Sequence, residues 1–138
     1  MKFEISDQPI DANGLRACMS DSRAGAFITF EGRVRDNNEG KEVKELEYEA
    51  YKSMAEKEGV KVLEAAKHQF EVIDAHAVHR VGKLALGDID VGGGVLRGHR
   101  DAAYQASRFI IDELKKNVPI WKKEIYTKEG VGWPFNEA

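Results

Sequence analysis

Several features that mark specialised classes of protein are missing from this sequence. Its single cysteine, Cys18, cannot form an internal disulfide, as is typical of a chain that folds in a reducing cytoplasm. No apolar run approaches the roughly 20 residues that span a bilayer, and the N-terminus lacks the basic and apolar regions of a signal peptide. The net charge of -3 gives no overall basic excess for nucleic acid or membrane surfaces. We therefore expect a cytoplasmic protein that binds neither nucleic acid nor membrane.

Motifs for metal binding and covalent catalysis are missing as well. The four histidines show no HExxH pattern and Cys18 has no partner cysteine, so we expect no metal site and no bound cofactor. The triplet Gly92-Gly93-Gly94 matches neither GxxxxGK[ST] nor GxGxxG and indicates a glycine-weakened strand or a bulge. Cys18 has no basic neighbour in the sequence closer than Arg16 to activate its thiol, so we expect a small buried residue there.

The chain does contain the pattern of an ordinary globular domain. Its 138 residues, 42% of them hydrophobic, suffice to bury the core of one domain that spans residues 1–138. Alternation of apolar and polar residues predicts strands over 1–5, 26–35, 44–51, 72–81 and 89–96, and one or two short strands between 121 and 133. The polar segment 36–40 is expected to join strands 26–35 and 44–51 as an antiparallel pair.

Helical periodicity predicts a short helix within 11–21 and two long helices over 53–70 and 101–117. We expect Asp11 to cap the first helix, Ser53 and Glu56 to form a capping box for the second, and Pro119 to end the third. The fold class is therefore α+β, with a mainly antiparallel sheet and two long helices. The expected buried faces of the long helices are Met54, Val62, Leu63, Ala66 and Phe70 on one, and Ala102, Ala106, Phe109, Ile110 and Leu114 on the other.

Two lysines near the end of the last helix are candidates for catalysis. Lys115 lies in the last helical turn, where the helix dipole favours a cation whether or not it has a catalytic role. Lys122 follows Pro119 and Trp121, whose apolar surface is expected to bury its stem. Burial favours the neutral amine that a general base or nucleophile needs.

Three further side chains are candidates for binding an anion. His99 and Arg100 precede the last helix, where an anion also meets the helix N-terminus. Alternatively, His99 caps the helix and Arg100 pairs with a nearby acid. Arg35 ends a predicted strand and either reaches a cleft or is a solvated charge beside Arg33. The residues by themselves leave these alternatives open.

Several segments, taken together and in order, resemble the large, catalytic subunit of molybdopterin synthase. They are FEGRVRDNNEG (30–40), LEYEAY (46–51) followed by Met54, HRVGKLALGD (79–88), GHRDAAYQA (98–106) and IDELKKNVPIWKKE (111–124). The resemblance covers most of the chain, from about Ala26 to Trp133, and implies an α/β hammerhead-type fold. It also implies a homodimer within a heterotetramer, with a small ubiquitin-like sulfur-carrier subunit on each protomer.

The same resemblance implies a sulfurtransferase. The partner's C-terminal Gly-Gly, activated as a thiocarboxylate, would enter the pocket and pass its sulfur twice to cyclic pyranopterin monophosphate, forming the dithiolene of molybdopterin. Lys115 would lie beside the thiocarboxylate and Lys122 beside the pterin, while Arg35, His99 and Arg100 would bind the substrate's phosphate or pterin oxygens. The large subunit of this family supplies no sulfur and needs no metal.

Two departures from the family pattern bear on this implied function. The strand before His99 is glycine-rich and carries Arg97, where small and apolar residues are usual, and no basic residue follows Trp133. Two other functions fit less of the sequence: a non-catalytic module of the same fold that binds a ubiquitin-like protein or a phosphorylated small molecule, and a small anion- or nucleotide-sensing domain.

Overall fold

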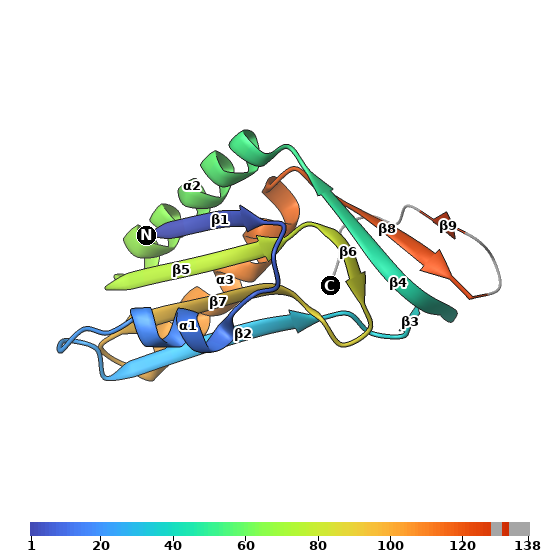
Figure 1. Cartoon of the computed structure of the whole chain (residues 1–138). Coiled ribbons are helices and arrows are strands. Elements are labelled where there is room, and N and C mark those ends of the chain that lie inside the picture. Colours follow the sequence, from blue (N-terminus) through green and yellow to red (C-terminus); the bar gives the residue numbers. More distant parts are fainter. Residues whose placement is uncertain (128–130, 133–138) are drawn as a thin grey trace.

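The computed structural model describes residues 1–127 and 131–132, which form two sheets and three helices (Figure 1). The helices are α1 (Ala12–Cys18), α2 (Lys52–Phe70) and α3 (Arg100–Asn117). None of these described helices is both long and apolar enough to cross a bilayer. The strands are β1 (Lys2–Ser6), β2 (Ala26–Arg33), β3 (Asn37–Asn38), β4 (Lys41–Ala50), β5 (Asp74–Arg80), β6 (Gly82–Ala85), β7 (Ile89–Arg97), β8 (Ile120–Tyr126) and β9 (Val131–Gly132).

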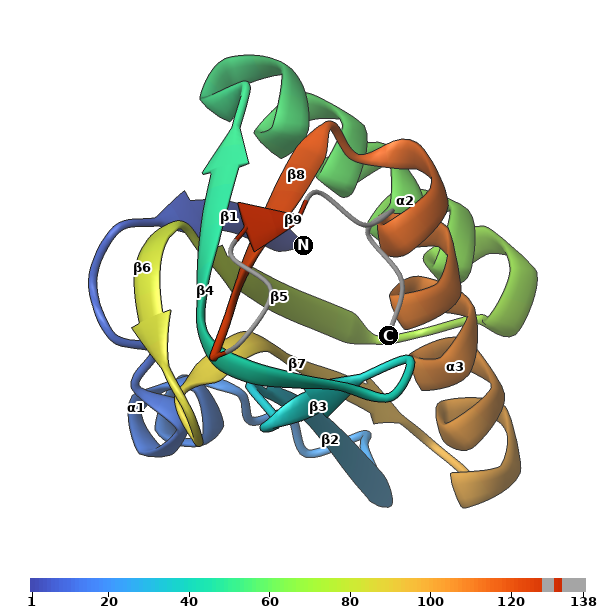
Figure 2. The same cartoon turned by 90° about the vertical axis from the view of Figure 1, so that its right-hand side faces the viewer.

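The two sheets differ in strand order and in what covers them. The first has the order β1-β5-β7-β2, and the second has the order β3-β4-β8-β9 with β6 beside β4. Neighbouring strands are antiparallel except β1 and β5, which run parallel. Figure 2 shows α2 and α3 on one face of the first sheet and α1 on the other, with the second sheet across its end. The predicted α+β class is confirmed.

The glycine triplet lies in the central strand of the first sheet. Gly92–Gly94 of β7 pairs regularly with β5 on one side and β2 on the other, so the strand interpretation is confirmed and the triplet itself holds no bulge. A Cβ at Gly94 would lie 2.8 Å from the Phe27 ring and 2.9 Å from the Met19 sulfur. The missing side chain therefore lets these two residues cover the sheet.

The predicted antiparallel pair of strands 26–35 and 44–51 is wrong. β2 pairs with β7 in the first sheet, whereas β4 pairs with β6 and β8 in the second. After β2 the backbone of Val34 exchanges hydrogen bonds with Asp88 and Gly87, which fixes the chain against the turn before β7. The chain then crosses to the second sheet, where β3 and β4 form a hairpin closed by Glu39 and Gly40, both at positive φ.

The predicted capping box of α2 is also wrong. The N-cap is Tyr51, without a side-chain hydrogen bond, and Oε2 of Glu56 instead accepts a hydrogen bond from the Ile5 backbone N–H at 3.0 Å. Glu56 thus serves the β1 backbone in place of its own helix. Met54 is 52% exposed, contrary to prediction, because the buried face is rotated toward Ala55, Gly59, Val62, Leu63 and Ala66.

On α3 the predicted buried face is confirmed for Ala106, Ile110 and Leu114. Ala103 is buried where Ala102 was expected, and Phe109 is half-buried with its ring centroid 5.6 Å from that of Phe70.

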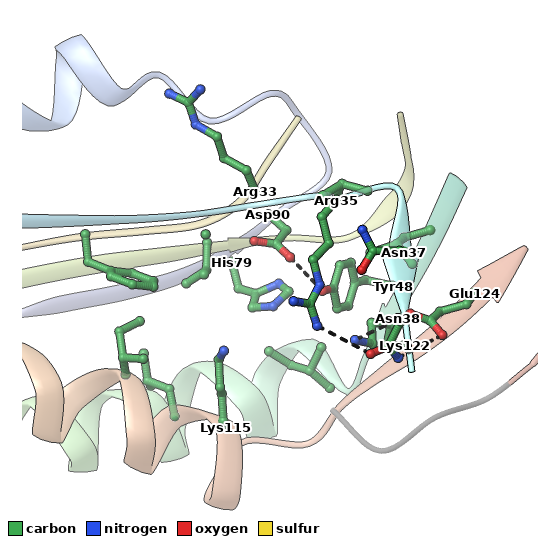
Figure 3. A pocket seen from close by; sticks show the side chains of 18 of the residues that line it. Arg33, Arg35, Asn37, Asn38, Tyr48, His79, Asp90, Lys115, Lys122 and Glu124 are labelled. Carbon is green, nitrogen blue, oxygen red and sulfur yellow. Dashed lines mark hydrogen bonds and ion pairs between the residues drawn. The ribbon is translucent and has the colours of Figure 1, made fainter. Parts of the chain in front are cut away.

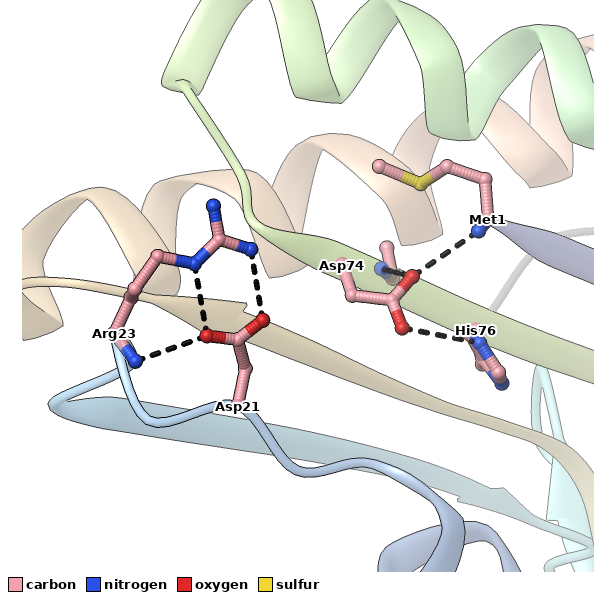
Figure 4. Close-up of polar contacts among 6 residues, drawn as sticks. Met1, Asp21, Arg23, Asp74 and His76 are labelled. Carbon is pink, nitrogen blue, oxygen red and sulfur yellow. Dashed lines mark hydrogen bonds and ion pairs between the residues drawn. The ribbon is translucent and has the colours of Figure 1, made fainter.

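Local acidic side chains order the segments around α1. Asp11 caps this helix as predicted, with its Oδ1 accepting a hydrogen bond from the Gly14 N–H at 2.9 Å. In the following loop, hydrogen bonds from Arg23 hold the pKa of the Asp21 carboxyl at about 2 (Figure 4).

At the other end of the chain, α3 ends at Asn117, before Pro119, as predicted.

Cys18 is exposed, contrary to the prediction of a buried residue. It ends α1, its thiol donates to the Leu15 carbonyl at 3.2 Å, and its sulfur lies 4.0 Å from Nδ1 of His76. The other ring nitrogen of His76 lies 3.3 Å from Asp74, which also binds the Met1 ammonium at 3.1 Å (Figure 4). This neighbouring imidazole comes from β5 and was therefore not visible in the local sequence.

Candidate functional site

A pocket of about 180 Å³ opens where the second sheet meets the first sheet and α3 (Figure 3). Segments far apart in the sequence line it, from Phe3 of β1 to Glu124 of β8. Of the five predicted site residues, Arg35, Lys115 and Lys122 line this pocket. The structure thus brings together three of the cations that the sequence analysis selected.

Lys122 reaches the pocket from β8, where it pairs with Tyr48 of β4. Because side chains alternate along a strand, Ile120, Lys122 and Glu124 point to the same side, and all three are buried. Trp121 points the other way and is 50% exposed. The predicted burial of the Lys122 stem is confirmed, but Trp121 does not provide it.

The buried carboxylate of Glu124 holds Lys122 in place. The lysine Nζ lies 3.8 Å from Oε2 of Glu124, which is 2% exposed. The other oxygen, Oε1, accepts hydrogen bonds from Asn38 at 3.1 Å and from the Tyr126 hydroxyl at 2.9 Å. These partners satisfy a charge that would be costly to bury alone, and Asn38 links the short strand β3 to β8.

Lys115 reaches the pocket from the last turn of α3 and is half-buried. Burial is the strongest influence and lowers the pKa of the Lys115 ammonium. The Asp90 carboxylate raises this pKa and Lys122 lowers it, followed by weaker effects of Asp112, which raises it, and Arg35, which lowers it. The net direction is downward, so Lys115 gives up its proton more readily than an exposed lysine does.

The remaining predicted residues occupy two different places. Arg35 is exposed just after β2, and its Nη2 lies 3.4 Å from Oδ1 of Asn38. His99 and Arg100 are exposed at the start of α3 and do not line the pocket. At 1.5 Å per helical residue they lie about 22–24 Å from Lys115. Within one chain, therefore, the structure does not bring them to the lysines.

Tyr48, His79 and Asp90 are among the pocket residues that the sequence analysis missed. The Tyr48 hydroxyl donates a hydrogen bond of 2.7 Å to Oδ2 of Asp90, and its ring packs edge-on against His79 at 4.7 Å between centroids. His79 and His76 lie on opposite faces of β5, so that His79 lines this pocket and His76 does not. The one feature of the sequence that could have identified Asp90 as a site residue is its position between Ile89 and Val91, as a carboxylate in an otherwise apolar strand.

The protonation states of Tyr48 and His79 follow from their burial. Nδ1 of His79 lies 2.8 Å from the Arg80 carbonyl, and burial lowers the pKa of the imidazole. His79 is thus neutral at pH 7. Burial, reinforced by the neighbouring Asp90, raises the pKa of the Tyr48 phenol. Tyr48 is therefore a hydrogen-bond donor throughout the physiological range.

This arrangement suits an anionic ligand that undergoes proton transfer. Cations from three segments converge on the pocket, and one of them, Lys115, has a lowered pKa. Among the described residues no group of three or more His, Cys, Asp or Glu side chains lies close enough to hold a metal ion.

Comparison with known proteins agrees with the resemblance seen in the sequence. The family model described as MoaE protein matches residues 5–117. A relative from Thermoplasma volcanium, named molybdopterin synthase catalytic subunit, is 38% identical over 130 residues, covering 94% of this chain and 95% of its own. The crystal structure of molybdopterin synthase from Staphylococcus aureus is 37% identical with a TM-score of 0.90, covering 96% of each chain.

A more distant likeness concerns the fold alone. One chain in a complex of subunits 1 and 2 of molybdopterin-converting factor from Helicobacter pylori has a TM-score of 0.72 at 24% identity, covering 92% of this chain and 90% of that one. The family match spans most of the sequence, and the pocket lysines lie within or next to the matched range. The chain therefore belongs to the MoaE protein family of molybdopterin synthase catalytic subunits.

Proposed function

We propose that this chain transfers sulfur from the C-terminal thiocarboxylate of a small ubiquitin-like partner to cyclic pyranopterin monophosphate, forming the dithiolene of molybdopterin. The observation that carries the proposal is the convergence of Lys115 and Lys122 on one pocket from α3 and β8. Both reactants are anions, so bringing them together requires cations at the place where they meet. Holding two reactants in register lowers the barrier by up to roughly 7–11 kcal/mol in the best intramolecular cases.

The proposed chemistry passes through a thioester. The thiocarboxylate sulfur attacks a carbon of the pyranopterin as the carbon–oxygen bond at that carbon breaks. The departing oxygen takes up a proton, and the partner's terminal carbonyl is then linked to the substrate through sulfur. Water then cleaves the bond between the carbonyl carbon and sulfur, leaving the sulfur on the pterin and a carboxylate on the partner. A second thiocarboxylate repeats the sequence at the neighbouring carbon.

The two lysines are suited to different parts of this sequence. Lys115, whose pKa is lowered by burial, moves protons as the carbon–sulfur bond forms and as water attacks the thioester. Lys122, held by the buried Glu124, stabilises negative charge on the substrate and on the tetrahedral intermediate. Arg35 is exposed beside them and binds the phosphate or the pterin oxygens.

His99 and Arg100 take part in this proposal only if a second protomer is present. They lie at the far end of α3 from Lys115, so a single chain cannot place them on the same substrate. A homodimer, within a heterotetramer that carries one small subunit per protomer, allows each chain to offer this pair to its neighbour's pocket. The name catalytic subunit, borne by the relatives, supports the existence of a second kind of subunit.

Reconstitution tests the proposal. The purified chain, a small partner ending in Gly-Gly as thiocarboxylate, and cyclic pyranopterin monophosphate are mixed, and the dithiolene product is measured. We expect Lys115→Ala and Lys122→Ala each to lower turnover by at least about 100-fold. Lys116→Ala changes the exposed neighbour of Lys115 and is the matched control. Normal turnover in both pocket variants contradicts the mechanism, and tight partner binding without product favours a non-catalytic binding module.

A further inference from the structure

Asp90 enters the pocket through a bulge in β7. Gly32 of β2 pairs with Val91, but the next residue, Arg33, pairs with Ile89, so Asp90 is an extra residue without a partner on β2. A bulge of this kind bends the strand and redirects the side chain of the extra residue. Asp90 lines the same pocket as Lys115 and Lys122 (Figure 3).

The Asp90 carboxylate is fixed in place but only partly satisfied. Its Oδ2 accepts the hydrogen bond from Tyr48, which is 5% exposed. Its Oδ1 is buried and has no hydrogen-bond partner among the described residues. That oxygen packs over Gly32, where a Cβ would lie 2.6 Å from it. A buried carboxylate with one hydrogen bond is costly unless a cation nearby offsets its charge.

Lys115 is the cation in the complementary position. It faces the same pocket and forms no ion pair within 4 Å with any residue in the described part of the chain. Asp90 is the acid with the largest electrostatic effect on it, ahead of Asp112 on its own helix. The other charged or titratable groups that face it or line the pocket are Arg33, Arg35, Tyr48, His79, Lys122 and Glu124.

We propose that Asp90 is a positioning residue for Lys115: its carboxylate, held by Tyr48 in the bulge, is the fixed negative charge that orients the lysine ammonium across the pocket. This role rests on the proposed function. In it, Asp90 acts on sulfur transfer through Lys115 and makes no contact with the reacting atoms. The absence of a side chain at Gly32, in the FEGRVR segment, then leaves room for the Asp90 carboxylate.

Asp90 and burial act on the pKa of Lys115 in opposite directions. Burial lowers the pKa of Lys115 and Asp90 opposes that effect. Removing the Asp90 charge therefore lowers the pKa of Lys115 further, and the neutral amine is present at lower pH. Asp90→Asn keeps an oxygen for the Tyr48 hydroxyl, Asp90→Ala removes the group, and Asp90→Glu restores the charge.

Competitive acetylation tests this claim without partner or pterin. The folded chain is labelled with trace acetic anhydride over a range of pH, and the reactivity of Lys115 is read by mass spectrometry against exposed Lys116 in the same peptide. We expect Asp90→Asn and Asp90→Ala to move the Lys115 curve to lower pH, with several-fold more labelling at a fixed pH near 8, and Asp90→Glu to return it toward the parent curve. Asp7→Asn, the same change at an exposed carboxylate outside the pocket, is the matched control.

Steady-state sulfur transfer gives the second readout. The limb of the pH profile that depends on Lys115 should move to lower pH in Asp90→Asn, with KM for the pterin unchanged. An unchanged labelling curve overturns the role of Asp90, and so does a raised KM with an unchanged pH profile, because it would make Asp90 a substrate contact. Since the labelling needs no turnover, its failure is distinct from a failure of the proposed sulfur transfer.

Discussion

The carboxylate of Glu124 lies 3.8 Å from the ammonium of Lys122 inside the pocket wall. The Glu124 side chain is only 3% exposed and that of Lys122 only 10%. An ion pair at this depth does not report stability directly, because desolvation of both charges opposes their attraction. Removing one partner is nevertheless costly, since the other charge remains buried. The pair therefore couples the position of a proposed catalytic lysine to the stability of the second sheet.

Glu124→Gln should destabilise the protein by about 2 kcal/mol, because the negative charge beside Lys122 is removed while Asn38 and Tyr126 keep an oxygen to bind. Urea unfolding measures the loss, and sulfur transfer should fall in parallel. Glu47→Gln is the matched control, since its pair with Lys123 at 3.5 Å is more exposed and is worth less than about 1 kcal/mol. Equal costs for the two variants would contradict a special role for Glu124.

Gly32→Ala should destabilise the first sheet at its bulge. The added Cβ would lie 2.6 Å from Oδ1 of Asp90 and 2.7 Å from Cγ1 of Val91, so the bulge must move. We expect a loss of about 1–3 kcal/mol in the free energy of unfolding. Gly98→Ala is the matched control, because a Cβ there meets nothing within 4 Å, and its effect should stay within about 0.5 kcal/mol. A neutral Gly32→Ala would show that Asp90 tolerates displacement.

His79 should make the protein less stable as the pH falls. Burial lowers the pKa of folded His79, whereas an unfolded histidine takes up a proton below about pH 6.5. The unfolded state then binds more protons, so stability rises with pH in this window and is lost as the pH falls. His79→Asn can keep the bond to the Arg80 carbonyl but cannot titrate.

The free energy of unfolding, measured between about pH 7.5 and 5.5, should therefore fall less in His79→Asn than in the parent chain. The same substitution at exposed His68 controls for the loss of a histidine as such. Parallel losses in the parent and in His79→Asn would assign the acid sensitivity to other groups.

Local periodicity predicted the elements of this fold better than their partners. The two long helices, the end of α3 before Pro119 and the burial of Lys122 depend on residues close in sequence, and all three are confirmed. Pairing of β2 with β7 and of β4 with β8 depends on segments far away, so the simple hairpin was the wrong choice. Glu56 shows the same dependence on distant segments, because its carboxylate accepts a hydrogen bond from the Ile5 N–H of β1 and does not cap its own helix.

The pocket shows why part of the site escaped prediction. Asp90 faces the lysines because a bulge redirects its side chain. A bulge depends on the register between two strands, and residue types alone do not predict that register. The hydrogen bond that places Tyr48 in the pocket depends on an acceptor, Asp90, that lies 42 residues later in the chain. The family resemblance assigned His99, Arg100 and Lys115 to one site, although the rigid helix α3 keeps the first two far from Lys115 within one chain.

Mixing two inactive variants tests whether His99 and Arg100 act on the pocket of a second protomer. Lys115→Ala damages the pocket of its own chain, whereas Arg100→Ala would damage the pocket of the neighbour. In a mixed dimer both defects then fall on one site, and the other site is intact. After random exchange about half of the dimers are mixed, so the mixture should recover about a quarter of full activity from two nearly inactive proteins. If Arg100 served its own chain's pocket, every site in the mixture would carry one defect and activity would not return. The readout is dithiolene formation after equilibration, with each variant equilibrated alone as the control.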